Sequence, residues 1–376
     1  MTQHRRVRIS EFGETAEDAL ENFSGLESWD GPNTSDLKST DVMIHVRSSS
    51  VLWVDVLMTS GQYQHMPSPP YTPGLEYSGD VAWVGSDVDP AVAAIGDKVL
   101  VEGFKVGPRS SGDYQGYGGF ATCAVAPQDA LIKIPEHFSY AQACNLLGNY
   151  ETAYHCLVTR GQLQAGETVL IHGASGATGM AAIQVAKIIG ATVIATGRSD
   201  KKLAIAKEFG ADHTINIRPT EGIEGVARFR DEVKALTDGK GAQVVYDGVG
   251  GPVSLESLRC LQFGARYLIV GWAATPNVSK GKGGRGAPNA NMLPTNLIQM
   301  KGLDVLGCPM VIATNNNPSL RKQRLSDIMR WVEEGKITPY ISHHFPLEQF
   351  KEAMLARWNG EVTGGCVLDI NGQTQK

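Results

Sequence analysis

A strand that runs into a glycine-rich turn and then into a helix constrains the fold of this chain more than any other feature. The segment is Glu167–Gly179, where an apolar run at 169–171 precedes Gly173, Gly176 and Gly179 at G-x-x-G-x-x-G spacing. In dinucleotide-binding folds these glycines permit the sharp turn, the approach of backbone N–H groups to a pyrophosphate, and close helix–sheet packing. The helix after the turn, about 180–189, would direct its positive end at the phosphates.

The residues after that helix favour a nucleotide site over a purely structural turn. A second apolar strand at 191–196 closes a βαβ unit of ~30 residues, as the fingerprint requires.

The end of the second strand predicts which cofactor binds. An NAD site places an acid there for the ribose 2′-hydroxyl, but this chain has none at the strand tip and continues with Arg198, Ser199, Lys201 and Lys202. Such donors suit a 2′-phosphate, so the sequence favours NADP(H). The alternative is that these residues form the solvated start of the next helix, where we expect Asp200 to act as a cap.

Size and charge limit the class of protein. A chain of 376 residues exceeds what one hydrophobic core usually supports, so two domains are expected. A net charge of −5 argues against a nucleic-acid or anionic-membrane partner. The chain contains no apolar stretch of ~18 residues and no signal-like start, so a cytoplasmic location is expected. The six cysteines are scattered without metal-ligand spacing, which favours reduced, buried thiols.

The pattern of elements changes once along the chain. Short β-rich runs between about 41 and 125 predict an irregular barrel, whereas alternating helices and strands from about 142 predict a doubly wound parallel sheet, so the class is α/β. A last strand, 366–370, is expected to return to the first domain. We therefore predict a first domain of 1–145 completed by about 312–376, and a nucleotide-binding domain of 146–311. The basic, glycine-rich segment 276–290 is expected to be a loop that closes over a ligand, meets a neighbouring subunit, or simply lies on the surface.

Several linked motifs resemble one known family. They are Asp55–Tyr63, Pro73–Gly79, Gly96–Val99, Gly118–Ala121, Tyr150–Tyr154, the glycine turn, Val245–Gly251 and Leu293–Lys301. On these motifs the chain resembles the zinc-free quinone oxidoreductases of the medium-chain dehydrogenase/reductase superfamily. The resemblance implies a GroES-like catalytic domain, a Rossmann domain, hydride transfer from NADPH, a small-molecule electrophile as substrate, and a homodimer or homotetramer.

The resemblance also implies further cofactor-binding residues by matched position. They are Asn149, Ser175, Ala177, Thr178, Gly197, Arg218, Val249, Gly250, Gly271, Trp272 and Ala273. Asn149 stands where relatives often have Thr, and its amide still offers a donor and an acceptor to the nicotinamide carboxamide. Arg218 is open to a second interpretation, a pair with a surface acid.

The resemblance bears on metal binding as well. Zinc-dependent relatives carry a histidine where this chain has Leu75, and no cysteine precedes Cys123. Without such ligands no Zn²⁺ site is expected, and oxidation of simple alcohols is not expected. The reaction that is still expected is therefore the reduction of a quinone or an α,β-unsaturated carbonyl.

The first domain holds the candidates for the acceptor site. Tyr63 matches a proton-donating tyrosine of enoyl-thioester reductases, and a role as an aromatic pocket wall is equally open. Leu52 and Trp53 replace polar residues of relatives and are expected to line the substrate pocket. For Asp55 we expect a structural role, and for His172 a buried, hydrogen-bonded one.

Two other functions remain open on the sequence. An enoyl-thioester reductase is supported by Tyr63 and by the basic residues 280–285, and a non-catalytic protein that keeps the nucleotide fold is compatible with the fold alone.

Overall fold

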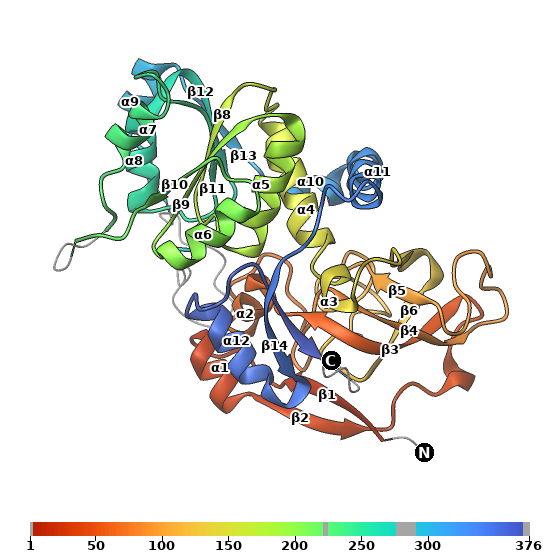
Figure 1. Ribbon diagram of the computed structural model, residues 1–376. Helices are drawn as coiled ribbons and strands as arrows, with labels where there is room; N and C mark the ends of the chain where they lie inside the picture. The colour runs from red at the N-terminus through yellow and green to blue at the C-terminus, as the bar shows by residue number, and fades with distance from the viewer. Residues whose placement is uncertain (1–2, 221–224, 276–290, 371–376) are drawn as a thin grey trace. The chain divides into compact units, whose positions relative to one another are not determined.

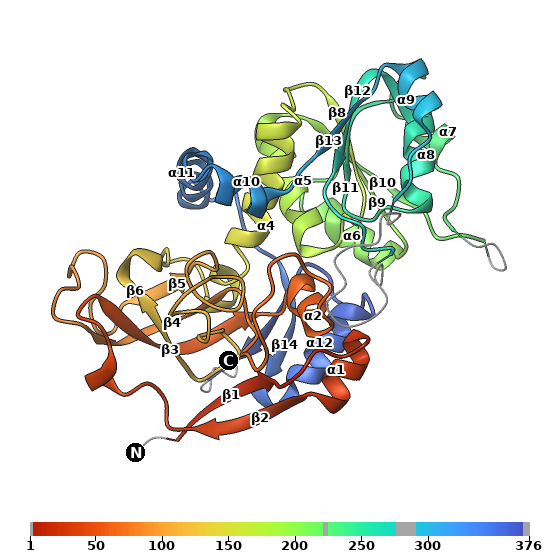
Figure 2. The same ribbon diagram turned by 180° about the vertical axis from the view of Figure 1, so that it is seen from behind.

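The computed structural model describes residues 3–220, 225–275 and 291–370, and they form two compact units. Of the described residues, those up to Leu147 and from Pro339 onward form the first unit, and those between Gly148 and Thr338 form the second. Figures 1 and 2 show the same chain from opposite sides. Each unit is described by itself below.

A largely antiparallel sheet forms the centre of the first unit. Its order is β14-β15-β3-β4-β5-β7, with β6 also paired to β3. The strands are β3 (Asp41–Ser50), β4 (Tyr77–Val84), β5 (Lys98–Val101), β6 (Cys123–Pro127), β7 (Leu131–Lys133), β14 (Ile341–Pro346) and β15 (Gly365–Asp369). Along β3 the side chains of Val42, Ile44 and Val46 are fully buried, as period-two alternation requires. The C-terminal strand completes this unit because β15 pairs antiparallel with β3.

Short elements surround this sheet. They are the hairpin β1 (His4–Ile9) and β2 (Ser24–Trp29), the helices α1 (Ala16–Asn22), α2 (Trp53–Thr59), α3 (Tyr140–Ala143) and α12 (Phe350–Trp358), and the 3₁₀ turns η1 (Thr34–Asp36), η2 (Gln128–Ala130) and η4 (Leu347–Gln349). Helices α1, α2 and α12 pack against one another.

A parallel sheet of order β10-β9-β8-β11-β12-β13 forms the second unit. The strands are β8 (Thr168–Ile171), β9 (Thr192–Gly197), β10 (His213–Asn216), β11 (Ala242–Asp247), β12 (Leu261–Ile269) and β13 (Asp304–Gly307). The central strands are apolar on both faces because helices cover both sides. Figure 1 shows α7, α8 and α9 on one face and α5 on the other. The expected doubly wound parallel sheet is therefore confirmed.

The helical elements of the second unit follow the order predicted by a βαβ pattern. They are α4 (Leu147–Tyr154), the π-helical segment η3 (His155–Arg160), α5 (Ala177–Ile189), α6 (Asp200–Glu208), α7 (Arg230–Ala235), α8 (Pro252–Cys260), α9 (Thr295–Lys301), α10 (Met310–Asn316) and α11 (Ser319–Glu333). None of the helices in the described ranges is long and apolar enough to cross a membrane.

The chain returns to the first unit at Pro339, later than the expected position of about 312. Helix α11 stays with the second unit because its charged side chains bind α4. Arg324 and Glu151, each 1% exposed, form an ion pair of 2.7 Å, and the Tyr154 hydroxyl donates to Asp327 over 2.7 Å. A buried ion pair of this kind resists separation because either charge alone would be left uncompensated.

Candidate functional site

The glycine turn has the geometry that the sequence predicts. Gly173 has a φ of 63°, and the N–H of Gly176 donates to its carbonyl over 3.0 Å. A Cβ at Gly179 would lie 2.3 Å from that same carbonyl oxygen, so only glycine lets α5 begin there. The N-cap residue of α5 is Gly176, which has no side chain to cap the first turn. The turn thus leads directly into a helix start of the type that binds a pyrophosphate.

His172, which follows β8, forms hydrogen bonds to β9 and α8. Its Nδ1 lies 2.7 Å from the Thr196 hydroxyl and its Nε2 2.6 Å from the Ser257 hydroxyl. The Ser257 hydroxyl donates to the Val253 carbonyl over 2.7 Å and so accepts from Nε2–H. The Thr196 hydroxyl lies 3.4 Å from the Ile171 carbonyl but only 2.7 Å from Nδ1, to which it donates. Burial lowers the pKa of His172 to about 4, which favours this neutral form. The expected buried, hydrogen-bonded role is confirmed.

Two arginines meet where β9 and β10 end. The Nε–H of Arg218 donates to the backbone carbonyl of Arg198 over 3.0 Å. Neither guanidinium forms an ion pair within the described ranges, and Arg198 is exposed. The interpretation of Arg218 as a partner of a surface acid therefore has no support among those residues.

Asp200, an acid next to the two arginines, is hydrogen-bonded to a neighbouring side chain. Its carboxylate accepts from the side-chain amide of Asn216 over 2.7 Å, and the Asn216 Oδ1 accepts from the N–H of Arg218. The expected role as helix cap is wrong, because Ser199 occupies the cap position and Asp200 is the first residue of α6. Asp200 instead connects the start of α6 to β10.

Asp247, which the sequence reasoning missed, holds the loop after β11. It is 1% exposed, and its Oδ1 accepts from the N–H groups of Val249 and Gly250 over 2.8 and 2.9 Å. Its Oδ2 accepts from the Ser254 hydroxyl over 2.7 Å and from the Tyr267 hydroxyl. An acid at a strand end before Gly-Val-Gly-Gly was the only signal in the sequence.

This loop brings together residues that were predicted separately. A Cβ at Gly173 would lie 3.2 Å from Val249 Cγ2, so Val249 lies beside the glycine turn. The N–H of Ala273 donates to the Gly248 carbonyl over 3.1 Å, and Gly250 lies close to Trp272. The segments 249–250 and 271–273 are thus neighbours at the same end of the sheet.

Asn149 also contacts the turn. Its Oδ1 accepts from the Thr178 hydroxyl over 3.1 Å, and the residue is 5% exposed. Of the remaining predicted residues, Ser175 and Ala177 lie within the turn and the start of α5, while Gly197, Ser199 and Lys202 lie at the junction of β9 and α6. The predicted cofactor residues therefore gather around the ends of β8, β9, β10, β11 and β12.

The first unit carries the predicted acceptor residues. Tyr63 and Leu52 pack against one apolar cluster that contains Ile9, Met58, Tyr71 and Leu75. The Tyr63 ring lies 6.1 Å from that of His65, and its hydroxyl has no hydrogen-bond partner in the part of the chain that the structure describes. Trp53 lies elsewhere, with its ring stacked on Trp358 at 5.0 Å and 19°.

Asp55 organises the backbone beneath this cluster. Its Oδ2 accepts from the N–H of Leu52 over 2.9 Å, and its Oδ1 accepts from those of Gly74 and Leu75 over 3.1 and 3.2 Å. Burial raises the pKa of Asp55 to about 7, against the lowering effect of these three donors. The expected structural role fits these contacts.

Leu75, which stands where zinc-dependent relatives are expected to carry a histidine, lies in apolar surroundings. Leu75 is 1% exposed and belongs to the same cluster as Met58 and Tyr71. Across residues 3–220, 225–275 and 291–370 no three His, Cys, Asp or Glu side chains lie close enough to hold a metal ion.

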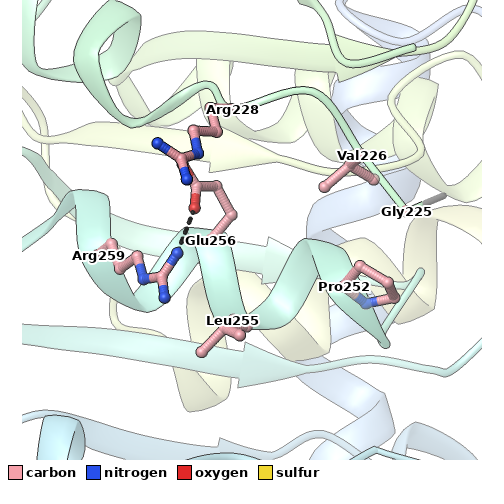
Figure 3. A pocket seen from close by; sticks show the side chains of 7 residues that line it. All are labelled: Gly225, Val226, Arg228, Pro252, Leu255, Glu256 and Arg259. Carbon is pink, nitrogen blue, oxygen red and sulfur yellow. Dashed lines mark hydrogen bonds and ion pairs between the residues drawn. The ribbon is translucent and has the colours of Figure 1, made fainter. Parts of the chain in front are cut away.

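A cavity of about 380 Å³ lies along α8, apart from the predicted cofactor residues. Figure 3 shows Arg228 above Glu256, and Arg259 bonded to that glutamate over 3.2 Å. The cavity is lined by Gly225, Val226, Arg228, Pro252, Leu255, Glu256 and Arg259.

The predicted loop at 276–290 falls outside the described residues.

Comparisons with known proteins agree with this architecture. The alcohol dehydrogenase GroES-like domain matches residues 38–136, and the zinc-binding dehydrogenase family matches residues 177–319. A quinone oxidoreductase-like protein 2 homolog of Nematostella vectensis is 33% identical over 90% of this chain and 84% of its own length. Quinone oxidoreductase of Homo sapiens is 28% identical over 84% of each chain.

A solved structure shows the same arrangement of elements. The quinone oxidoreductase of Pseudomonas syringae pv. Tomato DC3000 superposes with a TM-score of 0.74 at 26% identity, covering 97% of this chain and 99% of that one. With its GroES-like and Rossmann units and these relatives, the chain belongs to the quinone oxidoreductase-like family of the medium-chain dehydrogenase/reductase superfamily.

Proposed function

We propose that this oxidoreductase uses NADPH to reduce quinones or other α,β-unsaturated carbonyls, without zinc. The observation that carries the proposal is the junction of β9 and β10, where the Arg218 guanidinium binds the Arg198 carbonyl and, among the described residues, neither arginine pairs with an acid because the nearby Asp200 binds Asn216. A 2′-phosphate would gain charge-assisted hydrogen bonds there, whereas an NAD site would need an acid for the ribose.

The second unit supplies the other cofactor contacts in this proposal. The N–H groups at the start of α5 would bind the pyrophosphate, since the N-cap residue Gly176 has no side chain to bind them. Asp247 holds Val249 beside the turn, and Asn149 is fixed through Thr178. These contacts preorganise the nucleotide site and reduce the ordering cost of binding.

The bound nicotinamide supplies a hydride to an electron-poor carbon of the acceptor. The chain must then stabilise the developing oxyanion and deliver a proton. Tyr63 is the proposed donor because its hydroxyl has no partner among the described residues and its ring lies on the apolar cluster with Leu52. This cluster would also exclude water from the acceptor.

The absence of zinc in the proposal rests on Leu75. An alkyl side chain cannot bind Zn²⁺, and the surrounding residues of its cluster are apolar or aromatic. The acceptor must therefore be activated by its own conjugation and by hydrogen-bond donors.

The test is an NADPH-oxidation screen over simple quinones, enones and crotonyl or acryloyl thioesters. Turnover of quinones or enones supports the proposal. Preference for the thioesters by an order of magnitude in kcat/KM would replace it with an enoyl-thioester reductase. Tight NADPH binding with no oxidation by any acceptor would indicate a non-catalytic protein.

A further inference from the structure

We propose that Arg357 and Trp358, two consecutive residues of α12, are positioning residues that fix Leu52 in the acceptor pocket and thereby set the KM for the acceptor. The inference rests on the proposed function, because it concerns the acceptor site of that reaction. It adds a specificity determinant from the C-terminal part of the chain.

The first contact is to the backbone before Leu52. Arg357 is 8% exposed, and its Nε donates to the Val51 carbonyl over 3.0 Å while its Nη1 donates to the Gly364 carbonyl over 2.9 Å. The N–H of Val51 donates to the Cys366 carbonyl over 2.8 Å. Both backbone polar groups of Val51 are therefore bound by the C-terminal segment of the chain.

The second contact is to the side chain after Leu52. The indoles of Trp53 and Trp358 stack at 5.0 Å, and the Trp358 Nε1 donates to Glu17 of α1 over 2.5 Å. Because its own ring is hydrogen-bonded to α1, Trp358 restrains the Trp53 ring that stacks on it. Trp53 is the first residue of α2, so this stack also fixes where that helix begins.

Leu52 lies between these two fixed residues. Its own N–H is bound by Asp55, and its side chain packs on the apolar cluster that also carries Tyr63. A side chain whose neighbours on both sides are held has little freedom to move away from the acceptor. Sites that must match a ligand closely depend on such supporting contacts.

Packing alone does not account for an arginine at position 357. A buried arginine costs desolvation free energy, and burial lowers the pKa of Arg357 from its ordinary value. Its Nη2 is buried without a hydrogen-bond partner among the described residues. Burying the Arg357 side chain only to fill space would therefore cost free energy, but its guanidinium binds two carbonyls from different segments at once.

The experiment compares two properties of Trp358→Leu with wild type. Amide hydrogen exchange of residues 51–55 in the free protein should rise by about tenfold or more, since stacking no longer holds Trp53. The KM for quinone or enone should rise about three- to tenfold, the effect expected from losing one stacked pair, while kcat and the Kd for NADPH stay the same.

Three variants complete the comparison. Trp358→Phe keeps an aromatic ring and should return the KM toward the wild-type value. Trp29→Leu makes the same change in the β1–β2 hairpin, where Arg6 covers the ring at 4.5 Å, and should leave both measurements unchanged. Arg357→Met removes the two carbonyl bonds and should also raise exchange at residues 51–55. A variant that unfolds is identified by increased exchange throughout β3 and β4.

The outcomes separate this inference from the proposed function. Unchanged exchange at residues 51–55 in both folded variants, or raised exchange with no change in any acceptor KM, would overturn it. If none of the acceptors supports NADPH oxidation by the wild-type protein, the proposed function fails. The exchange measurement alone then decides whether α12 positions residues 51–55.

Discussion

The guanidinium of Arg218 is anchored on the backbone carbonyl of Arg198, 3.0 Å away, although the two residues follow different strands. This contact places two positive side chains at one edge of the parallel sheet. Among the described residues neither guanidinium forms an ion pair, and the neighbouring Asp200 carboxylate instead accepts from the Asn216 amide. The relationship is the physical basis for the proposed choice of cofactor.

Replacing Arg198 by Ala should weaken binding of NADPH much more than binding of NADH. Each charge-assisted contact to a 2′-phosphate contributes about 1.5–3 kcal/mol, so the Kd for NADPH should rise by at least about tenfold. Titration calorimetry with both cofactors measures the change. Lys207→Ala, at the other end of α6, is the matched control. Equal affinities of the wild-type protein for the two cofactors would refute the assignment.

Replacing Tyr63 by Phe tests the proton donor. On an enone kcat should fall by roughly 10²–10⁴-fold, the usual contribution of a positioned acid. Quinone turnover should fall much less, because the oxygens of a reduced quinone can take protons from water. Steady-state kinetics on both substrates provide the comparison. Full activity of the variant on the enone would make Tyr63 a pocket wall.

Replacing Asp247 by Ala should lower both stability and cofactor affinity. Four hydrogen bonds are lost and the buried Tyr267 hydroxyl is left without its acceptor, a cost of about 1–3 kcal/mol for each unsatisfied group. The Kd for NADPH should rise because Val249 and Gly250 are no longer held. Denaturant unfolding and calorimetry measure the two effects, with exposed Asp304→Ala of β13 as control. A variant with wild-type affinity would limit Asp247 to a role in folding.

Stability should fall as the pH drops from about 6.5 toward 4. Burial, with Arg324 and Arg160 nearby, lowers the pKa of His155 to about 4, and burial lowers that of His172 equally. Within this window the unfolded chain binds protons that the folded protein does not, at up to about 1.4 kcal/mol per pH unit and histidine.

The variant His155→Leu isolates one of these contributions. Its free energy of unfolding should depend less steeply on pH between 6.5 and 4.5 than that of wild type, as measured by urea unfolding at several pH values. His137→Leu, which changes an exposed histidine, should keep the wild-type slope. An identical slope for the His155 variant would show that this imidazole takes up its proton over the same pH range in the folded protein as in the unfolded chain.

Activity should be unaffected by metal chelators. Leu75 and its apolar neighbours offer no ligand to Zn²⁺, so the rate of NADPH oxidation should be the same before and after treatment with EDTA. Elemental analysis of the purified protein provides the second measurement. One equivalent of zinc whose removal abolishes turnover would contradict the proposal.

Local sequence determined the glycine turn and the two kinds of sheet. The glycines predict the turn because Gly173 has a positive φ, which favours glycine, and a Cβ at Gly179 would lie 2.3 Å from a carbonyl oxygen, which excludes a side chain. Apolar runs such as 169–171 identify buried parallel strands in the same direct way. Element boundaries were less exact: the helix expected at about 180–189 begins at Ala177, and the last strand, expected at 366–370, is Gly365–Asp369, because packing decides where an element ends.

Only the tertiary structure decided which distant side chains meet. Asp247 with Tyr267, Arg218 with Arg198, and Trp53 with Trp358 are pairs that no local pattern relates. The placement of α11 in the second unit likewise depends on the ion pair of Arg324 with Glu151. Such contacts follow from topology and register, which bring residues far apart in the chain together. Local sequence fixes propensity and backbone conformation, but a long-range partner is chosen by the packing of the whole fold.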